Sequence, residues 1–221
     1  MFFNIFKNEI SYWLDRPAFY VYSLIFLFIA VMTSGSAAGL FDSLTVTVGS
    51  SRIVNSPFAL SGLFAGLSSL VIFLYPSIIG VSVYRDFKSE MHTILYSYPF
   101  TKLEYLLAKF FSGIFIVHII VFLIGIGIAL GFNLPGTNPD LLTDFDIKPY
   151  FDAYIIYVLP NMLFTGAIVF GIVTFTRNIS AGFIFVIVIL ILQGFLVSFG
   201  QEQENRFCLL YTSPSPRDQL Q

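Results

Sequence analysis

Three polar side chains that could contact a substrate lie inside long apolar stretches of this sequence: His118, Asn161 and Gln193. An ionisable or polar group in such a stretch is a candidate for a functional site. The competing interpretation is structural, because these groups also form hydrogen bonds between neighbouring helices. The three residues are therefore candidates either for a transport pathway or for inter-helix contacts.

The charged residues gather in a different segment, 84–109, between two apolar runs. Its apolar residues recur at helical spacing, while Lys88 and His92 fall on other faces. The pattern predicts a short amphipathic helix over 86–98, ended by Pro99. The apolar stripe consists of Phe87, Met91, Ile94, Leu95 and Tyr98. Such a helix either rests on lipid or docks into a partner protein, and the pattern alone does not decide between them.

Five apolar runs must position these groups, and each is long enough to cross a bilayer as a helix of about 20 residues. The runs lie near 18–35, 59–84, 105–132, 151–176 and 181–199. Lys109 lies in the first turns of the third run, whose start is marked by a capping box, Thr101 to Glu104. The fold class we expect is an all-helical, multi-pass membrane protein, with a transmembrane domain over 17–206.

Glycine and proline residues indicate where the expected helices can pack closely and where they should bend. Gly127-x-x-x-Gly131 and Gly62-x-x-x-Gly66 are spacings that permit close helix approach. Pro76 and Pro160 should kink their helices, since proline lacks the backbone N–H.

Composition supports a membrane protein and excludes several other classes. Hydrophobic residues make up 57% of the chain and charged residues 11%, with a mean hydropathy of +0.84. Soluble domains have about 25% charged residues. A net charge of −2 without a basic patch argues against nucleic-acid binding. The single cysteine, Cys208, excludes an internal disulfide. The chain has neither a Gly-x-x-x-x-Gly-Lys-Ser/Thr nucleotide loop nor a His-Glu-x-x-His zinc motif.

The distribution of basic residues predicts the orientation in the membrane. Basic residues are most frequent before the first run and in the second connection, and such loops face the cytoplasm. We therefore expect a cytoplasmic N-terminus in a cell inner membrane. A cleaved signal peptide is the alternative for the first run. It is disfavoured because Glu9 and Asp15 offset Lys7 and Arg16 in the segment that should be positive.

Residues 1–16 are expected to form an interfacial amphipathic helix, with Pro17 marking a break before the first run. One face carries apolar side chains and the other polar ones. The apolar face is formed by Phe2, Phe3, Phe6, Ile10, Trp13 and Leu14. The alternative is a continuous extension of the first membrane helix.

The charged segment resembles the second cytoplasmic loop of type-2, exporter-like ABC transporter permeases. The resemblance rests on Asp86, Glu90, Thr93, Ile94-Leu95, Tyr98-Pro99, Lys102 and Lys109. The segment departs from the family at His92-Thr93, where Gly-Thr is usual. The resemblance implies six membrane helices and an ATPase-coupling helix. The coupling residues would be Asp86, Phe87, Glu90, Met91, Ile94, Leu95, Tyr98, Pro99 and Lys102.

The resemblance also implies a function. The chain would be the permease subunit of an ATP-driven exporter, with no enzymatic activity or cofactor of its own. ATP and Mg²⁺ would bind to a separate ATP-binding cassette subunit. The permease would work as a homodimer or with a second permease half.

Shorter motifs resemble a bacterial subgroup of these permeases whose chain continues into a gluzincin aminopeptidase domain. They are Asn55-Ser-Pro57, Tyr84-Arg-Asp86, Ser97-Tyr-Pro99 and Leu159-Pro-Asn161. The last residues, from Cys208 to Asp218, resemble a translated sequencing adapter. We therefore expect 208–221 to be a non-native tail on a truncated chain that lacks the sixth helix.

Two other functions remain open at this point. The helices could chiefly anchor a C-terminal peptidase domain, or the protein could be a secondary transporter. A secondary transporter would be expected to show internal repeats and charge near the middle of the membrane, and neither is clear here.

Overall fold

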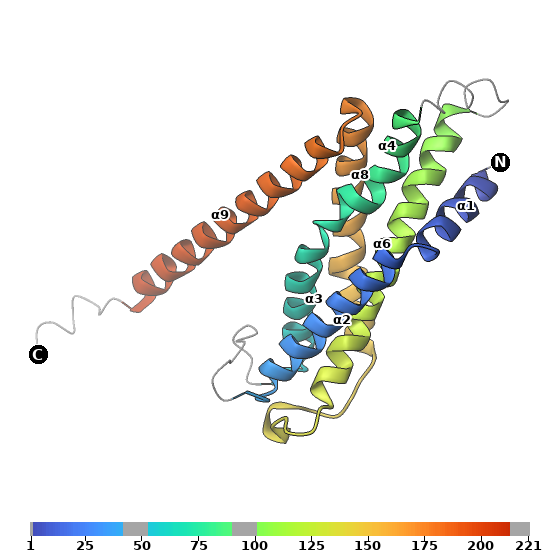
Figure 1. Ribbon diagram of the computed structural model, residues 1–221. Helices are drawn as coiled ribbons and strands as arrows, with labels where there is room; N and C mark the ends of the chain where they lie inside the picture. The colour runs from blue at the N-terminus through green and yellow to red at the C-terminus, as the bar shows by residue number, and fades with distance from the viewer. Residues whose placement is uncertain (1, 42–52, 90–100, 213–221) are drawn as a thin grey trace, which may run out of the picture. The chain divides into compact units, whose positions relative to one another are not determined.

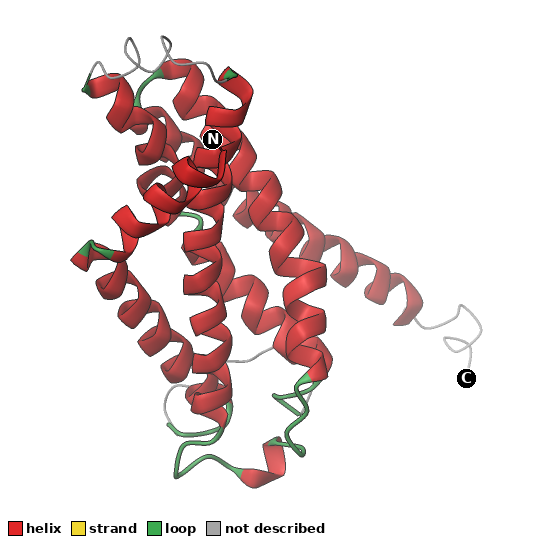
Figure 2. Ribbon diagram, turned by 90° about the vertical axis from the view of Figure 1, so that its right-hand side faces the viewer, coloured by secondary structure: helices red, strands yellow, loops and turns green. Residues whose placement is uncertain are grey.

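The computed structural model describes residues 2–41, 53–89 and 101–212. Throughout these ranges the regular structure is helical (Figures 1 and 2). The chain divides into two compact units, Met1–Phe183 and Ile184–Gln221. The first unit contains every helix before α9 (Ile179–Thr212) and the start of α9 itself, whereas the described part of the second unit is the remainder of α9. The expected all-helical architecture is confirmed for the described residues.

The first two helices are separate elements. Helix α1 (Phe2–Leu14) ends at a turn, and α2 (Pro17–Ala37) begins with proline at its first position. Arg16 between them is extended, with φ −90° and ψ 127°. Proline fits the first helical turn because its missing N–H would have no partner there. The alternative from the sequence, a continuous helix through this region, is therefore wrong.

The second apolar run forms a bent helix. Ser56 accepts a hydrogen bond from the Ala59 N–H and caps α3 (Pro57–Val71). After a short break the chain continues as the π-helix η1 (Pro76–Gly80) and then α4 (Val81–Lys88). The two halves meet at 43°, and Pro76 opens the second half, so the predicted kink at this proline is confirmed.

Helix α6 (Lys102–Phe132) is the longest element of the first unit, and α1 and α2 both pack against it (Figure 1). Its 31 residues span about 46 Å. Thr101 accepts a hydrogen bond from the Glu104 N–H, so the predicted helix start is confirmed. A Cβ at Gly127 would lie 2.8 Å from the Ala30 Cβ, so this glycine lets α2 and α6 approach closely, as the sequence predicted.

The fourth run begins after a loop that contains the short 3-10 helix η2 (Pro139–Leu141). Helix α7 (Lys148–Ala153) passes into the π-helix η3 (Tyr154–Val158) and then into α8 (Leu159–Thr176). These three pieces form one continuous segment of 29 residues. The π-helical turn lies directly before Pro160, where the sequence predicted a kink. Arg177 ends α8 in the left-handed conformation, with φ 51°.

Four helical segments in the described ranges are long and apolar enough to cross a membrane, or five if the bent segment 57–88 counts as one span. The four are Pro17–Ala37, Lys102–Phe132, Lys148–Thr176 and Ile179–Leu196. Many of their large apolar side chains, such as Leu24, Phe122 and Phe164, are exposed. Apolar surface of this extent suggests a membrane protein, because water would oppose its exposure.

Candidate functional site

Four charged side chains meet where α1, α4 and α6 come together. Glu9 Oε1 lies 2.7 Å from Arg85 Nη2 and 3.0 Å from Lys109 Nζ. Asp86 forms an ion pair with Lys109, and its Oδ1 lies 3.8 Å from Arg85 Nε. We call these four residues the charge cluster. It joins the N-terminal helix to two helices that lie more than 60 residues later in the sequence.

The charge cluster is largely shielded from solvent. The side chains of Lys109 and Glu9 are only 3% and 7% exposed, whereas Asp86 is 16% and Arg85 33% exposed. Buried charges are tolerated when they are paired, and here two carboxylates balance two cations. This balance also makes the cluster a poor cation site, because Arg85 and Lys109 already neutralise both acids.

Helix α6 presents two adjacent groups to the end of α4. Tyr105 and Lys109 are four residues apart and therefore lie on the same face of the helix. The Tyr105 hydroxyl donates a hydrogen bond to Asp86, and the Lys109 ammonium donates one to the Ser82 carbonyl oxygen. Asp86 therefore receives contacts from α6 through both a hydroxyl and an ammonium group.

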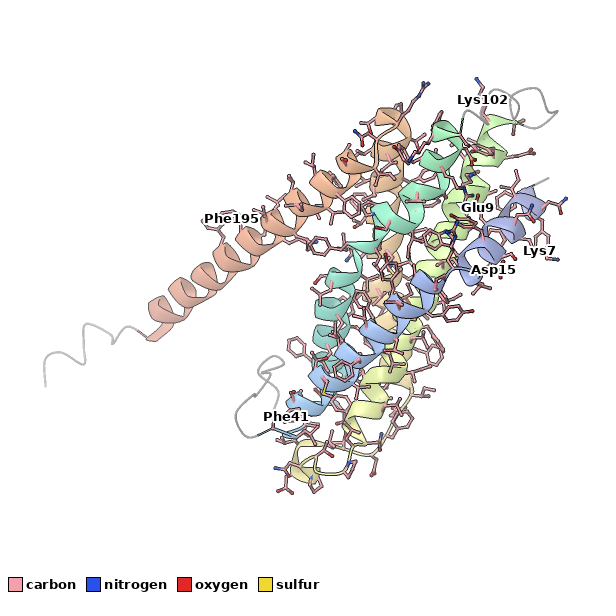
Figure 3. All side chains as sticks on the ribbon, viewed as in Figure 1. Lys7, Glu9, Asp15, Phe41, Lys102 and Phe195 are labelled. Carbon is pink, nitrogen blue, oxygen red and sulfur yellow. The ribbon has the colours of Figure 1, made fainter. Side chains whose placement is uncertain are left out.

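Helix α1 contributes a carboxylate and an aromatic ring. Glu9 and Trp13 are its buried residues, and Figure 3 shows Glu9 on the side of α1 that faces α6, with Lys7 on another side. The Arg85 guanidinium carbon lies 3.9 Å from the centre of the Tyr12 ring, within cation–π range. A separate aromatic contact joins α1 to α6, where the ring centre of Phe6 lies 6.0 Å from that of Phe115.

Two atoms of the charge cluster are buried and lack a hydrogen-bond partner among the described residues. They are Glu9 Oε2 and Arg85 Nη1. A network with unused donors and acceptors in a low-dielectric setting is sensitive to small rearrangements, because each unpaired group carries a desolvation penalty. The cluster can hold α1, α4 and α6 in register, and a shift of any one helix would change its pairing.

Of the predicted coupling residues, the structure places three. Asp86 lies in the charge cluster. Phe87 lies beneath the guanidinium group of Arg177, whose Cζ is 5.0 Å from the ring centre. Lys102 is the exposed first residue of α6 (Figure 3). The other six lie outside the described residues: Glu90, Met91, Ile94, Leu95, Tyr98 and Pro99.

The three polar residues inside the apolar runs have different surroundings. His118 Nδ1 is hydrogen-bonded to the hydroxyl of Tyr154 in η3, which links α6 to the fourth run. Asn161 is exposed, and its Oδ1 accepts a hydrogen bond from Thr165 one turn later in the same helix. Gln193 lies in the part of α9 that belongs to the second unit and is half-buried.

Reasoning from sequence singled out Asp86 and noted Lys109, but it did not assign a site role to Glu9, Arg85 or Tyr105. The sequence does contain one signal of this site. Glu9 falls within the apolar stripe of α1, seven residues after Phe2 and four before Trp13. A lone carboxylate on an apolar face requires a cationic partner, and Lys109 is the corresponding lone cation in an apolar run.

No protein-family model, curated protein or solved structure matches this chain.

Proposed function

We propose that this protein is the membrane-spanning permease subunit of an ATP-driven exporter of the type-2 ABC class. ATP would be hydrolysed on a separate cassette subunit, and the permease would work as a dimer or with a second permease half. In this arrangement the chain has five membrane helices of an expected six. Its N-terminus and the charge cluster face the cytoplasm of a bacterial cell, and α1 lies at the membrane interface.

The observation that carries the proposal is the position of Asp86. This residue begins the segment 86–98 that resembles the coupling helix of such permeases. Its carboxylate is held by Lys109 and Tyr105 of α6, and its neighbour Arg85 is held by Glu9 of α1. A force applied to the coupling segment would therefore reach two further helices through charged contacts that are mostly buried.

The mechanism follows from this connection. The partner ATPase would move the segment 86–98 when its nucleotide site closes. Phe87 would transmit part of that movement to the turn after α8, through its contact with Arg177. The charge cluster would transmit the rest to α1 and α6. The permease would thus act as a lever, and its own residues would perform no bond chemistry.

Co-purification tests the proposed docking. The permease would be co-expressed with the cassette ATPase proposed as its partner, as wild type and as the variants Leu95→Ala and Glu90→Lys. If Leu95 is buried in the complex, its truncation removes on the order of 1–3 kcal/mol of contact, which weakens docking roughly five- to hundredfold. Glu90→Lys should act through the charge complementarity of the two surfaces.

The matched control for Leu95→Ala is Leu24→Ala, which truncates an exposed leucine on α2, away from the coupling segment. Wild-type recovery of the ATPase with both coupling variants would contradict the proposed docking role. In that case, a helix that rests on lipid would be the better interpretation of the segment.

A further inference from the structure

An apolar groove with a volume of about 500 Å³ lies between α3, α6 and the segment formed by α7 and η3. All of its lining residues belong to the first unit, and six of the thirteen are aromatic. None of the thirteen is an Asp, Glu, Lys or Arg. Two of its polar groups already have hydrogen bonds, Asn133 to the Ala129 carbonyl and Tyr154 to His118. The groove is therefore suited to an apolar occupant.

The dimensions of the groove match one leaflet of a bilayer. Along α6 its lining extends from Val121 to Asn133, at the end of the helix. Twelve helical steps correspond to about 18 Å. One leaflet contributes about 15 Å of hydrocarbon, half of the total thickness. In a bilayer whose hydrocarbon boundary lies at the end of α6, the groove would reach about the middle of the membrane.

One wall of the groove is open to the surroundings of the protein. Phe122 on α6 is 57% exposed and Phe151 on α7 is 52% exposed, and both line the groove. In a membrane these exposed side chains would face lipid. An apolar chain could therefore enter sideways from the bilayer without crossing water.

The loop that supplies part of the groove lining is acidic. The range 133–152 contains the exposed acids Asp140, Asp144, Asp146 and Asp152, with Lys148 as the only basic residue. Phe145, which lines the groove, lies between two of these acids.

This loop is held in place by a second segment of the chain. Asn55 Nδ2 donates a 2.7 Å hydrogen bond to the Thr143 carbonyl, and Asn55 Oδ1 accepts one of 2.9 Å from the Thr143 N–H. The loop that carries Asp144 and Asp146 is therefore tied to the segment that precedes α3.

We propose that this groove binds the acyl chain of a membrane amphiphile whose head group carries an ammonium charge, with Asp144 and Asp146 beside the head group. The apolar lining, the length of the groove, the lateral opening and the acidic loop that supplies Phe145 and Ile147 each match one part of such a molecule. The inference does not depend on ATP-driven transport, since it concerns binding from the bilayer to this chain alone.

Photo-crosslinking in vesicles tests the proposal without an ATPase. The full chain would be reconstituted in phosphatidylcholine vesicles that contain a phospholipid probe with a diazirine on its acyl chain. One probe would carry an ethanolamine head group and the other a glycerol head group. Peptide mapping after illumination should place the adducts of the ethanolamine probe on residues 121–133 and 145–154. The yield of groove adducts should be about threefold higher with that probe than with the glycerol probe, as expected for an exposed charge pair.

Matched variants separate the groove from ordinary lipid contact. Ala129→Trp places an indole in the groove, whereas Ala167→Trp places one on an exposed position of α8 outside it. The first should lower groove labelling on the order of tenfold, since the indole displaces at least two methylene groups of the chain. The second should leave it unchanged. The double variant Asp144→Asn and Asp146→Asn, at exposed positions, should abolish the head-group preference without lowering labelling by the glycerol probe.

Three results would overturn the proposal. One is equal labelling of the groove in the two tryptophan variants when both are folded. A second is equal labelling by the two probes in the wild-type protein. The third is formation of protein–protein adducts from a photoreactive residue at position 126 in place of lipid adducts, which would show that a second copy of the chain covers the groove.

Discussion

The carboxylate of Glu9 in α1 and the ammonium group of Lys109 in α6 form a buried ion pair, with Oε1 and Nζ 3.0 Å apart. The pair fixes the N-terminal helix against the helix that follows the proposed coupling segment. Because Lys109 also pairs with Asp86, one ammonium group connects α1 to the end of α4. The stability of this junction and its role in coupling can be measured separately.

Removing the charge of Glu9 should destabilise the protein. Glu9→Gln leaves Arg85 and Lys109 with only Asp86 as a counter-charge in a mostly buried site. Breaking a buried pair in this way costs about 3 kcal/mol. The measurement is thermal unfolding in detergent, with the exposed substitution Glu104→Gln as control. Equal melting temperatures for the two variants would show that the pair does not stabilise the fold.

A double-mutant cycle should reveal direct coupling between the two members of the pair. Glu9→Gln with Lys109→Met leaves Arg85 and Asp86 as a neutral pair, so the double variant should lose less stability than the sum of the single variants. The expected coupling energy is about 0.5–3 kcal/mol, as for residues in contact. Strict additivity would argue against the contact between Glu9 and Lys109.

The close packing of α2 against α6 should depend on Gly131. A Cβ at this position would lie 1.9 Å from Ser34 Oγ and 2.5 Å from the Val31 carbonyl oxygen. Gly131→Ala should therefore destabilise the protein by about 1–3 kcal/mol. Gly66→Ala is the matched control, because a Cβ there meets nothing within 4 Å. The control should be neutral or stabilising by up to about 1 kcal/mol, since alanine favours helix. Equal loss of stability in both variants would contradict the packing argument.

Local signals in the sequence predicted the elements of the fold well. The apolar runs marked the helices, Thr101 marked the start of α6, and Pro76 marked the bend. These features depend on a few neighbouring residues, so the sequence contains them directly. Of the two glycine spacings, Gly127-x-x-x-Gly131 lies at a helix contact, whereas the space beside Gly66 is open. The spacing permits a contact but does not supply the partner helix.

The site was harder to predict, because it depends on which faces of the helices meet. The apolar stripe of α1 includes Trp13, which is buried, and Phe3, which is exposed. Hydrophobic periodicity does not distinguish a face that packs on protein from a face that meets lipid. The pairing of Glu9 with Arg85 and Lys109 joins residues from three helices, and only the packing of α1 on α6 brings them together.

The proposed orientation can be tested by cysteine labelling in intact cells. Cys208 would first be replaced by serine, and Ser89→Cys and Asp144→Cys would then be made at exposed positions near opposite ends of the membrane helices. A membrane-impermeant maleimide should label position 144 from outside and position 89 only after the cells are opened, because the basic loops face the cytoplasm. Labelling of position 89 in intact cells would contradict this orientation and would support the inverted one.

ATP turnover in proteoliposomes directly tests the proposal that this chain couples to an ATPase through the segment 86–98. The cassette ATPase proposed as the partner would be assayed with the wild-type permease, with Leu95→Ala and with the control Leu24→Ala. We expect the wild type and the control to change the turnover rate of the ATPase equally, and Leu95→Ala to lose this effect. A turnover rate with Leu95→Ala equal to that with the wild type, or a rate that no permease changes, would contradict the proposed coupling.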